Sequence, residues 1–174
     1  WLCARRSREA TPDRGNYPQP MTAQRARAAI EASGIGFTVT EHGPVKSLEE
    51  AAAARGLTPE RVIKSIVVRR AADDFLFVLV PGGRSIDWPK LRSHLGVNRA
   101  SMPNADEAFE ITGYVRGTIT PFGSREALPV IRDAAVPDGQ VSIGGGSHGV
   151  AFTVDAADLV RALDAEVADV SHAE

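Results

Sequence analysis

The sequence has little cysteine and no clustering of histidine. Its single cysteine, Cys3, cannot form an intramolecular disulfide, which excludes the disulfide-stabilised scaffolds of small secreted proteins. The four histidines are His42, His94, His148 and His172, and none has metal-ligand spacing with cysteine or with another histidine. We therefore expect no metal site.

Long apolar runs and a dominant charge are also missing. No apolar run approaches the length of a membrane span, and the N-terminus lacks the apolar core of a signal peptide, so we expect a cytoplasmic protein without membrane contact. The formal net charge of −2 excludes the global basic field with which some proteins bind nucleic acid unaided. Any contact with RNA should therefore be local.

What is present indicates one folded domain. The chain has 174 residues, of which 43% are hydrophobic and 24% charged, enough to bury a core of its own. Residues 1–20 precede the first methionine, contain four arginines and show no hydrophobic periodicity. We expect them to be a disordered leader or a remnant of upstream sequence, with a basic arm that touches RNA phosphates as the alternative. The folded domain should span residues 21–174.

Local patterns predict five helices and six strands. One helix runs from Thr22 to Gly34, and four more follow the N-caps Ser47, Asp87, Asn104 and Asp155. The predicted strands are 37–40, 62–68, 75–80, 128–131, 140–143 and 150–154. The continuous apolar run 75–80 suits a strand buried on both faces, in a hairpin with 62–68. We expect an α/β fold of the α+β type, a single domain with a mixed, mostly antiparallel sheet covered by helices.

The segment from Gly113 to Gly123 is the most unusual part of the chain. It reads GYVRGTITPFG, and its three glycines, one proline and two aromatics fit neither a regular helix nor a regular strand. Glycine lets the backbone approach a ligand closely and proline fixes the backbone, so the segment predicts a rigid loop that presents amides to a bound molecule. An ordinary turn is the alternative.

A lysine stands inside the β-branched run VIKSIVV, residues 62–68. Period-2 alternation gives Lys64 the apolar neighbours Val62 and Ile66 on its own side of the strand. An ammonium group there should find an anionic partner, extend to water or have its pKa lowered. A lysine that protects an edge strand from aggregation is the alternative.

The glycine-rich segment GGGSHG, residues 144–149, matches two known patterns, the dinucleotide-binding G-x-G-x-x-G and the hydrolase G-x-S-x-G. Both require a helix directly afterwards, whereas residues 150–154 are strand-like. We therefore expect a connection between strands, with Ser147 and His148 available for hydrogen bonds.

Four segments in register resemble the YbaK family of aminoacyl-tRNA deacylases, which is related to the editing domain of bacterial prolyl-tRNA synthetase. They are VIKSIVV around Lys64, GYVRGTITPFG, the glycine turn GGSHG and the ending ADLVRALDAEVADV. The resemblance runs from about Met21 to the C-terminus. It implies a single α/β domain that acts in trans and hydrolyses the ester between a wrong amino acid and the 3′ end of tRNA, without a metal or an organic cofactor.

The resemblance also assigns roles by position. Lys64 matches the functional lysine beside the terminal adenosine, residues 117–121 match the GxxxP loop at the aminoacyl group, and residues 146–149 match the glycine turn opposite. We expect Lys64, Gly117 and His148 to be catalytic, with His148 orienting a water molecule. The expected substrate contacts are Ser65, Tyr114, Thr118, Ile119, Thr120, Pro121, Phe122, Gly146, Ser147 and Gly149.

The amino acid removed stays open, because the chain departs from the cysteinyl-tRNA(Pro) branch of the family. Thr40 stands where that branch has a tyrosine, and Ala151 where it has an acid. Alanyl, seryl or another small aminoacyl ester is as plausible as cysteinyl. The expected partners are the tRNA acceptor end and a synthetase or elongation factor. The alternatives are a non-catalytic module that binds a nucleotide or a synthetase, and a serine hydrolase that uses Ser147.

Overall fold

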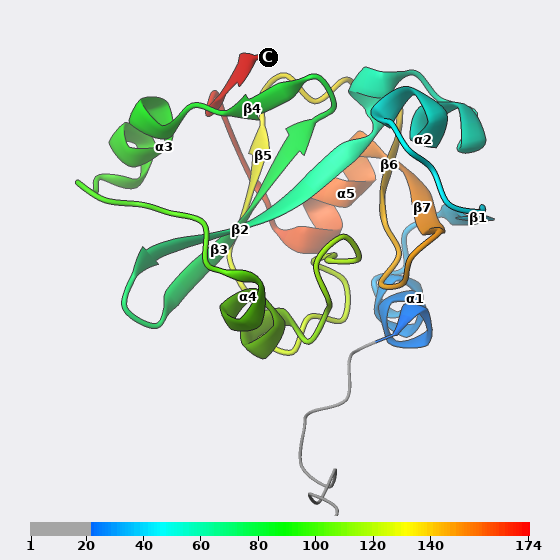
Figure 1. Ribbon diagram of the computed structural model, residues 1–174, viewed down its shortest axis with the longest axis horizontal. Coiled ribbons are helices and arrows are strands. Elements are labelled where there is room, and N and C mark those ends of the chain that lie inside the picture. Colours follow the sequence, from blue (N-terminus) through cyan, green and yellow to red (C-terminus); the bar gives the residue numbers. More distant parts are fainter. Residues whose placement is uncertain (1–21) are drawn as a thin grey trace, which may run out of the picture.

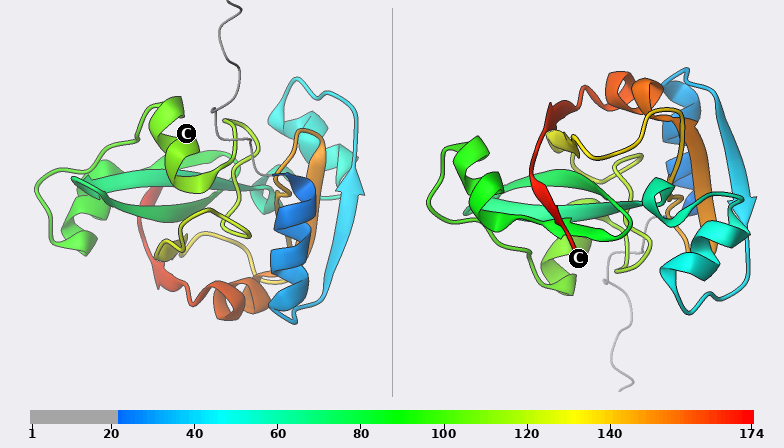
Figure 2. Two further views of the ribbon diagram at one scale, coloured as in Figure 1. Left: turned by 90° about the horizontal axis from the view of Figure 1, so that it is seen from below. Right: turned by 90° about the horizontal axis from the view of Figure 1, so that it is seen from above.

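The computed structural model describes residues 22–174, so the predicted leader lies outside the described residues. Its helices are α1 (Ala23–Ala32), α2 (Leu48–Ala54), α3 (Trp88–Leu95), α4 (Ala105–Thr112) and α5 (Ala156–Leu163), with a 3-10 turn at Pro59–Arg61. Its strands are β1 (Phe37–Glu41), β2 (Ile63–Ala71), β3 (Asp74–Pro81), β4 (Arg84–Ile86), β5 (Val130–Asp133), β6 (Gln140–Gly144), β7 (Val150–Asp155), β8 (Glu166–Ala168) and β9 (Ser171–Ala173). Helix α3 lies at one end of the molecule, with α1 and α2 at the other (Figures 1 and 2).

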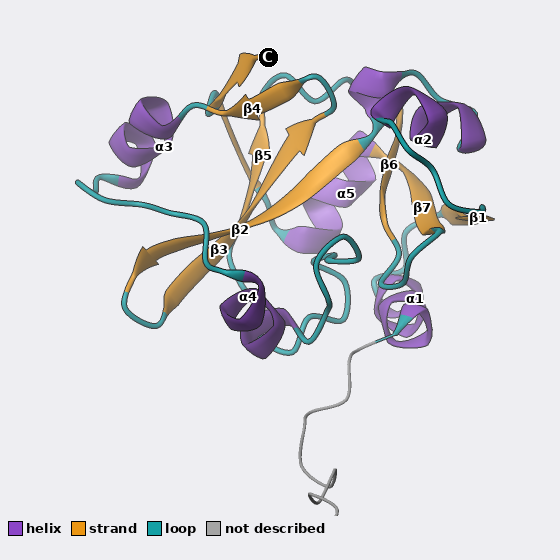
Figure 3. Cartoon of the chain, viewed as in Figure 1, coloured by secondary structure: helices purple, strands orange, loops and turns teal. Residues whose placement is uncertain are grey.

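The predicted N-caps are confirmed in the geometry. The side chains of Ser47, Asp87, Asn104 and Asp155 accept hydrogen bonds from N–H groups in the first turns of α2 to α5. Gly113 follows α4 in the left-handed conformation, with φ of 79°, and so ends the helix where the unusual loop begins. Figure 3 shows α1 to α4 around the edge of the view and α5 near its centre, behind the strands.

The strands form three sheets. β1, β7 and β6 pair antiparallel in that order, and β4 pairs antiparallel with β9. In the sheet of order β2-β3-β5-β8, β2 and β3 form the predicted antiparallel hairpin, whereas the other two pairs are parallel. A parallel bridge between Val62 and Ser142 joins β2 to β6. The prediction of mixed, mostly antiparallel strands is confirmed, with the strands distributed over three sheets.

β3 is buried on both faces, as its continuous apolar run predicts. Its odd-numbered side chains from Phe75 to Leu79 pack in a hydrophobic cluster with α1 and α5. The even-numbered ones from Leu76 to Val80 pack in a second cluster with α3. The same alternation along β2 places Ser65 on the side of the first cluster and Lys64 on the side of the second.

The sequence does not predict β4, β8 and β9. Each has three residues, which is too short for a period-2 pattern to stand out, and each exists because a distant strand pairs with it. β5 begins at Val130 rather than at Leu128, directly after Pro129, which has no N–H group for a sheet.

Candidate active site

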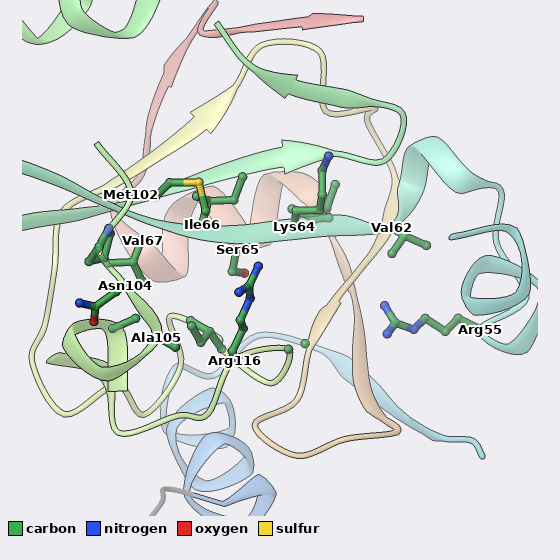
Figure 4. A pocket seen from close by; sticks show the side chains of 16 residues that line it. Arg55, Val62, Lys64, Ser65, Ile66, Val67, Met102, Asn104, Ala105 and Arg116 are labelled. Carbon is green, nitrogen blue, oxygen red and sulfur yellow. The ribbon is translucent and has the colours of Figure 1, made fainter. Parts of the chain in front are cut away.

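A cavity of about 500 Å³ lies along β2, an edge strand of its sheet. Residues 62–67 form one wall, and residues 102–105, which lead into α4, form another. Arg116, Gly117 and Ile119 close the cavity from the loop Gly113–Gly123. Figure 4 shows these side chains, with Arg55 reaching in from the end of α2. The cavity therefore brings together the lysine strand and the glycine-rich loop that the sequence analysis singles out.

β2 offers main-chain groups to this cavity. Within residues 22–174 its outer edge pairs at two points, Val62 with Ser142 and Arg69 with Ser101. Arg69 exchanges both backbone hydrogen bonds with Ser101, so strand alternation turns the peptide groups of Ser65 and Val67 toward the same edge. Between the two bridges this edge is unpaired among the described residues. A bound molecule can form main-chain hydrogen bonds there.

The Lys64 side chain points to the opposite side of β2 from Ser65 (Figure 4). Its amine donates to the carbonyl oxygen of Arg84 and to Oε1 of Glu174, the latter at 3.1 Å. Hydrogen bonds from Ser85 and then from Lys64 lower the pKa of the Glu174 carboxyl. Lys64 has thus found an anionic partner, one of the outcomes expected from its sequence. Because the Lys64 side chain is 37% exposed and that of Glu174 52%, the ion pair contributes little to stability and can be exchanged for substrate.

The cavity wall carries positive charge and no acid. Its charged lining residues are Arg55, Lys64 and Arg116, of which Lys64 directs its amine to Glu174. The hydroxyl of Ser65 is buried there without a hydrogen-bond partner among the described residues. Such a lining suits a ligand that brings negative charge and hydrogen-bond acceptors.

Internal hydrogen bonds hold the Gly113–Gly123 loop in one conformation. Tyr114 is fully buried and its hydroxyl donates to the carbonyl oxygen of Phe122 at 2.6 Å. Burial raises the pKa of Tyr114 to about 12. Both the N–H and the hydroxyl of Thr118 donate to the carbonyl oxygen of Val115. The loop is braced at its base and in its middle, as expected of a segment that presents groups to a ligand.

Gly117 and His148 meet beside the cavity. Gly117 has φ of 89°, and a Cβ at this position would lie 3.3 Å from Cε1 of His148. Glycine is therefore needed both for the backbone conformation and for the approach of the imidazole. The His148 side chain is exposed, where it can contact water or a ligand. Two of the three expected catalytic residues are thus neighbours.

The rest of the glycine turn supports the fold. Oγ of Ser147 accepts a hydrogen bond from the N–H of Ala23 at 3.0 Å and so caps α1, whose N-cap residue Thr22 forms no side-chain cap. Gly146 lies against α1, and Gly149 against the backbone of His42. The dinucleotide-binding and hydrolase patterns both require a helix after the glycine turn, whereas the strand β7 follows it, so neither pattern applies. The engagement of Ser147 with α1 also argues against its use as a nucleophile.

The structure places the expected site residues in two groups. Lys64, Ser65, Gly117 and Ile119 line the cavity. The others stand behind or beside it: Tyr114, Thr118, Thr120, Phe122 and Gly146 are buried, Pro121, Ser147 and Gly149 are half-buried, and His148 touches Gly117. The sequence analysis misses Arg55, because an arginine at the end of a helix has no distinguishing local pattern. It also passes over Arg116, although this residue lies inside the loop that it selects.

A second cavity, of about 440 Å³, is rich in arginine. Arg69, Arg70, Arg92 and Arg99 line it. The segment between α3 and α4 borders both cavities, the second through residues 98–101 and the first through residues 102–105. Arg69 pairs with Glu107 and Arg70 with Asp74, whereas Arg92 and Arg99 form no ion pair within residues 22–174. Positive charge thus extends along β2 although the chain has a net charge of −2.

Comparison with known proteins decides the family. The family model described as "Aminoacyl-tRNA editing domain" matches residues 42–162, which is more than half of the chain. The chain belongs to the aminoacyl-tRNA editing domain family. This confirms the resemblance seen in the sequence and, at the level of the family, the expectation of an aminoacyl-tRNA deacylase. None of the helices described in residues 22–174 has the length and apolarity to cross a membrane.

Relatives of this editing domain include both a free-standing enzyme and synthetases. It is 28% identical over 116 residues to the "Multifunctional Ser/Thr-tRNA deacylase ProXp-y" of Escherichia coli (strain K12), covering 65% of this chain and 70% of the relative. It is 33% identical over 96 residues to the proline–tRNA ligase of Bacillus licheniformis, covering 55% of this chain and 17% of the ligase. The match therefore spans about a sixth of that enzyme.

Solved structures confirm the fold of the editing domain. A candidate trans-editing enzyme for prolyl tRNA synthetase superposes with a TM-score of 0.80 and 27% identity, covering 86% of this chain and 96% of the other. A hypothetical protein, APE2540, gives a TM-score of 0.77 and 25% identity, covering 85% and 99%. The single α/β domain predicted from the sequence is thus the fold of these proteins as well.

Proposed function

We propose that this editing domain hydrolyses the ester of a mischarged aminoacyl-tRNA that carries a small amino acid, with serine and threonine as the first candidates and alanine and cysteine next. One observation carries the proposal: Lys64 and Ser65 of β2 and Gly117 of the loop, with His148 against it, surround one cavity lined by cations. The name of the Escherichia coli relative gives serine and threonine priority.

The terminal adenosine and its ester would lie between the unpaired edge of β2 and the Gly113–Gly123 loop. The cavity volume of about 500 Å³ falls within the usual range for small-molecule sites. Peptide groups of Ser65 and Val67 are available for hydrogen bonds to the adenosine. Lys64 would anchor a ribose or phosphate oxygen, which fixes the ester in the position for attack.

The chemistry needs a water molecule rather than a protein nucleophile. The water oxygen attacks the ester carbonyl carbon, the bond from that carbon to the ribose oxygen breaks, and the ribose oxygen takes up a proton as the amino acid leaves. Loop N–H groups around Gly117 would stabilise the negative charge that develops on the carbonyl oxygen, and one such donor is typically worth roughly 100- to 1000-fold in rate. His148, next to Gly117, would orient the water.

The RNA would reach the cavity along β2, past the second cavity. Val67 lines the first cavity and Arg69 the second, and these residues are two apart on β2, roughly 7 Å, so a few single-stranded nucleotides can span both cavities. Arg92 and Arg99 would contact their phosphates. We propose that residues 21–174 act in trans in the cytoplasm. Because the chain as a whole is weakly acidic, a synthetase or elongation factor would supply further affinity for the tRNA.

Amino acid release from a panel of esters tests the proposal. The panel holds seryl-, threonyl-, alanyl- and cysteinyl-tRNA, each on tRNA(Pro) and on its own tRNA, with correctly charged prolyl-tRNA(Pro) as the control. We expect at least one small aminoacyl ester to be cleaved well above the rate in buffer, and prolyl-tRNA(Pro) to be spared. If no ester is cleaved, even with a synthetase added, the chain is the non-catalytic module of the alternative hypothesis.

A further inference from the structure

Arg55 is a half-buried cation without a compensating charge among residues 22–174. It follows the last residue of α2, and its guanidinium points into the cavity wall (Figure 4). One nitrogen donates to Oγ of Ser142 at 3.2 Å, whereas Nε is buried without a partner. None of the ion pairs between side chains of residues 22–174 includes Arg55. Burial lowers the pKa of Arg55.

An arginine with a purely structural role would form several hydrogen bonds to other segments of the chain. Arg61, for example, donates to the carbonyl oxygens of Asp138 and Gln140, and so fastens one segment to another. The Arg55 side chain makes one hydrogen bond among residues 22–174, to the neutral hydroxyl of Ser142 on β6, where Arg61 makes two to carbonyl oxygens. A half-buried guanidinium with a buried, unpartnered Nε and no acid beside it costs stability, so the arrangement points to a bound anion that completes it.

The same cavity holds further hydrogen-bond donors. Ser65 has a buried hydroxyl without a partner among the described residues, and Arg116 extends from the loop toward β2. No aspartate or glutamate lines the cavity. Arg55 therefore has no carboxylate in the cavity wall with which to pair.

We propose that Arg55 binds a phosphate of the nucleotide that enters the cavity. The assignment rests on the proposed function, because in an aminoacyl-tRNA the amino acid carboxylate is esterified and the remaining anions are phosphates. A guanidinium has the planar fork that matches two phosphate oxygens. Arg55 is thereby a positioning residue: it holds the nucleotide so that the ester lies at Gly117, while Lys64 acts from the other side of β2.

Melting and binding measurements on Arg55→Met test this assignment. Without ligand, the variant should melt at or above the temperature of the wild type, since it removes an uncompensated, half-buried charge. Adenosine 5′-monophosphate should bind the variant roughly 10- to 100-fold more weakly than the wild type, whereas adenosine should bind both equally. Arg55→Lys keeps the charge but loses the planar fork, so its affinity for the monophosphate should lie between those of the wild type and Arg55→Met. Arg27→Met, on the exposed face of α1, is the control and should match the wild type throughout.

The outcomes separate this inference from the function on which it rests. If esters are hydrolysed but Arg55→Met binds the monophosphate as tightly as the wild type does, the phosphate site is refuted and the deacylase stands. If binding of the monophosphate depends on Arg55 but no ester is cleaved, the phosphate site is supported and the proposed deacylase function is refuted. A lower melting temperature of Arg55→Met with unchanged binding would show a structural arginine. Inorganic phosphate should protect the wild type less than the nucleotide does, and equal protection would overturn the assignment to the RNA terminus.

Discussion

At the scale of single residues, the Tyr114 hydroxyl closes the base of the Gly113–Gly123 loop. Tyr114→Phe keeps the ring but leaves the buried carbonyl of Phe122 without its donor. We expect the free energy of unfolding to fall by about 1–3 kcal/mol, because a buried acceptor is left unsatisfied. Urea denaturation measures the change, and a loosened loop should slow deacylation as well. Unaltered stability would show that the hydrogen bond is not needed to hold the loop.

The same residue gives the protein a pH dependence at the alkaline end. Burial raises the pKa of Tyr114 to about 12 in the fold, whereas an unfolded tyrosine ionises near pH 10. The neutral hydroxyl therefore stabilises the fold fully below about pH 10, and this contribution is lost as the pH rises toward 12. Melting temperatures over this range should fall more steeply for the wild type than for Tyr114→Phe. If the melting temperatures of the two proteins fell in parallel with pH, Tyr114 would not be the cause of the alkaline loss of stability.

Adjacent residues of the glycine turn should separate stability from activity. Ser147→Ala removes the cap of α1, so it should cost about 0.5–2 kcal/mol of stability and leave the chemical step intact. His148→Ala removes an exposed ring beside Gly117, so it should leave the melting temperature intact and slow deacylation by about 100-fold. Full activity of His148→Ala would remove the water-orienting role, and loss of activity in a folded Ser147→Ala would revive the serine hydrolase.

At the scale of elements, the loop must keep its conformation at Gly117. Gly117→Ala strains a backbone with φ of 89° and pushes against His148, so the donors of the loop are displaced. We expect about 1 kcal/mol of lost stability and roughly 100-fold lost kcat. Gly139→Ala is the matched control, since it has φ of 85° and lies outside the cavity wall. Equal kcat losses in the two variants would show that strain alone, rather than the position of the loop, governs activity.

Elements with a local signature could be predicted from the sequence. Side chains such as Ser47 and Asn104 show where helices begin because they bond to the backbone a few residues away. The apolar run of β3 likewise shows a strand buried on both faces. The short strands β4 and β9 have no such signature, since each is stabilised by a partner far along the chain. The division into three sheets depends on tertiary packing for the same reason.

At the scale of the whole molecule, only those residues of the candidate site that have a local signature could be predicted from the sequence. Lys64 and the loop could be found because their residue types conflict with their surroundings. Arg55 could not, because its significance comes from the lack of an acid near it in space. Ser147 could be misassigned for the related reason that its hydroxyl faces α1 from a distant part of the chain.

The arginine-lined second cavity should set the affinity for tRNA without affecting the chemistry. Arg92→Gln combined with Arg99→Gln should raise KM about tenfold and leave kcat unchanged, because phosphate contacts are lost. The slope of the logarithm of tRNA affinity against the logarithm of salt concentration should become shallower by about 0.7 to 0.9 for each phosphate contact removed. Arg27→Gln combined with Arg161→Gln changes the net charge equally on exposed helix faces and is the control. If the control raises KM as much, the effect is one of overall charge.

Single-turnover hydrolysis of the ester that the panel identifies, by wild type and Lys64→Ala, tests the central claim most directly. Lys46→Ala, an exposed lysine outside the cavity wall, is the control. Lys64→Ala should fold normally, since it loses one half-exposed ion pair, and its rate should fall by about 100-fold or more while Lys46→Ala keeps the wild-type rate. A folded Lys64→Ala that hydrolyses the ester at the wild-type rate would contradict the claim that this cavity is the active site.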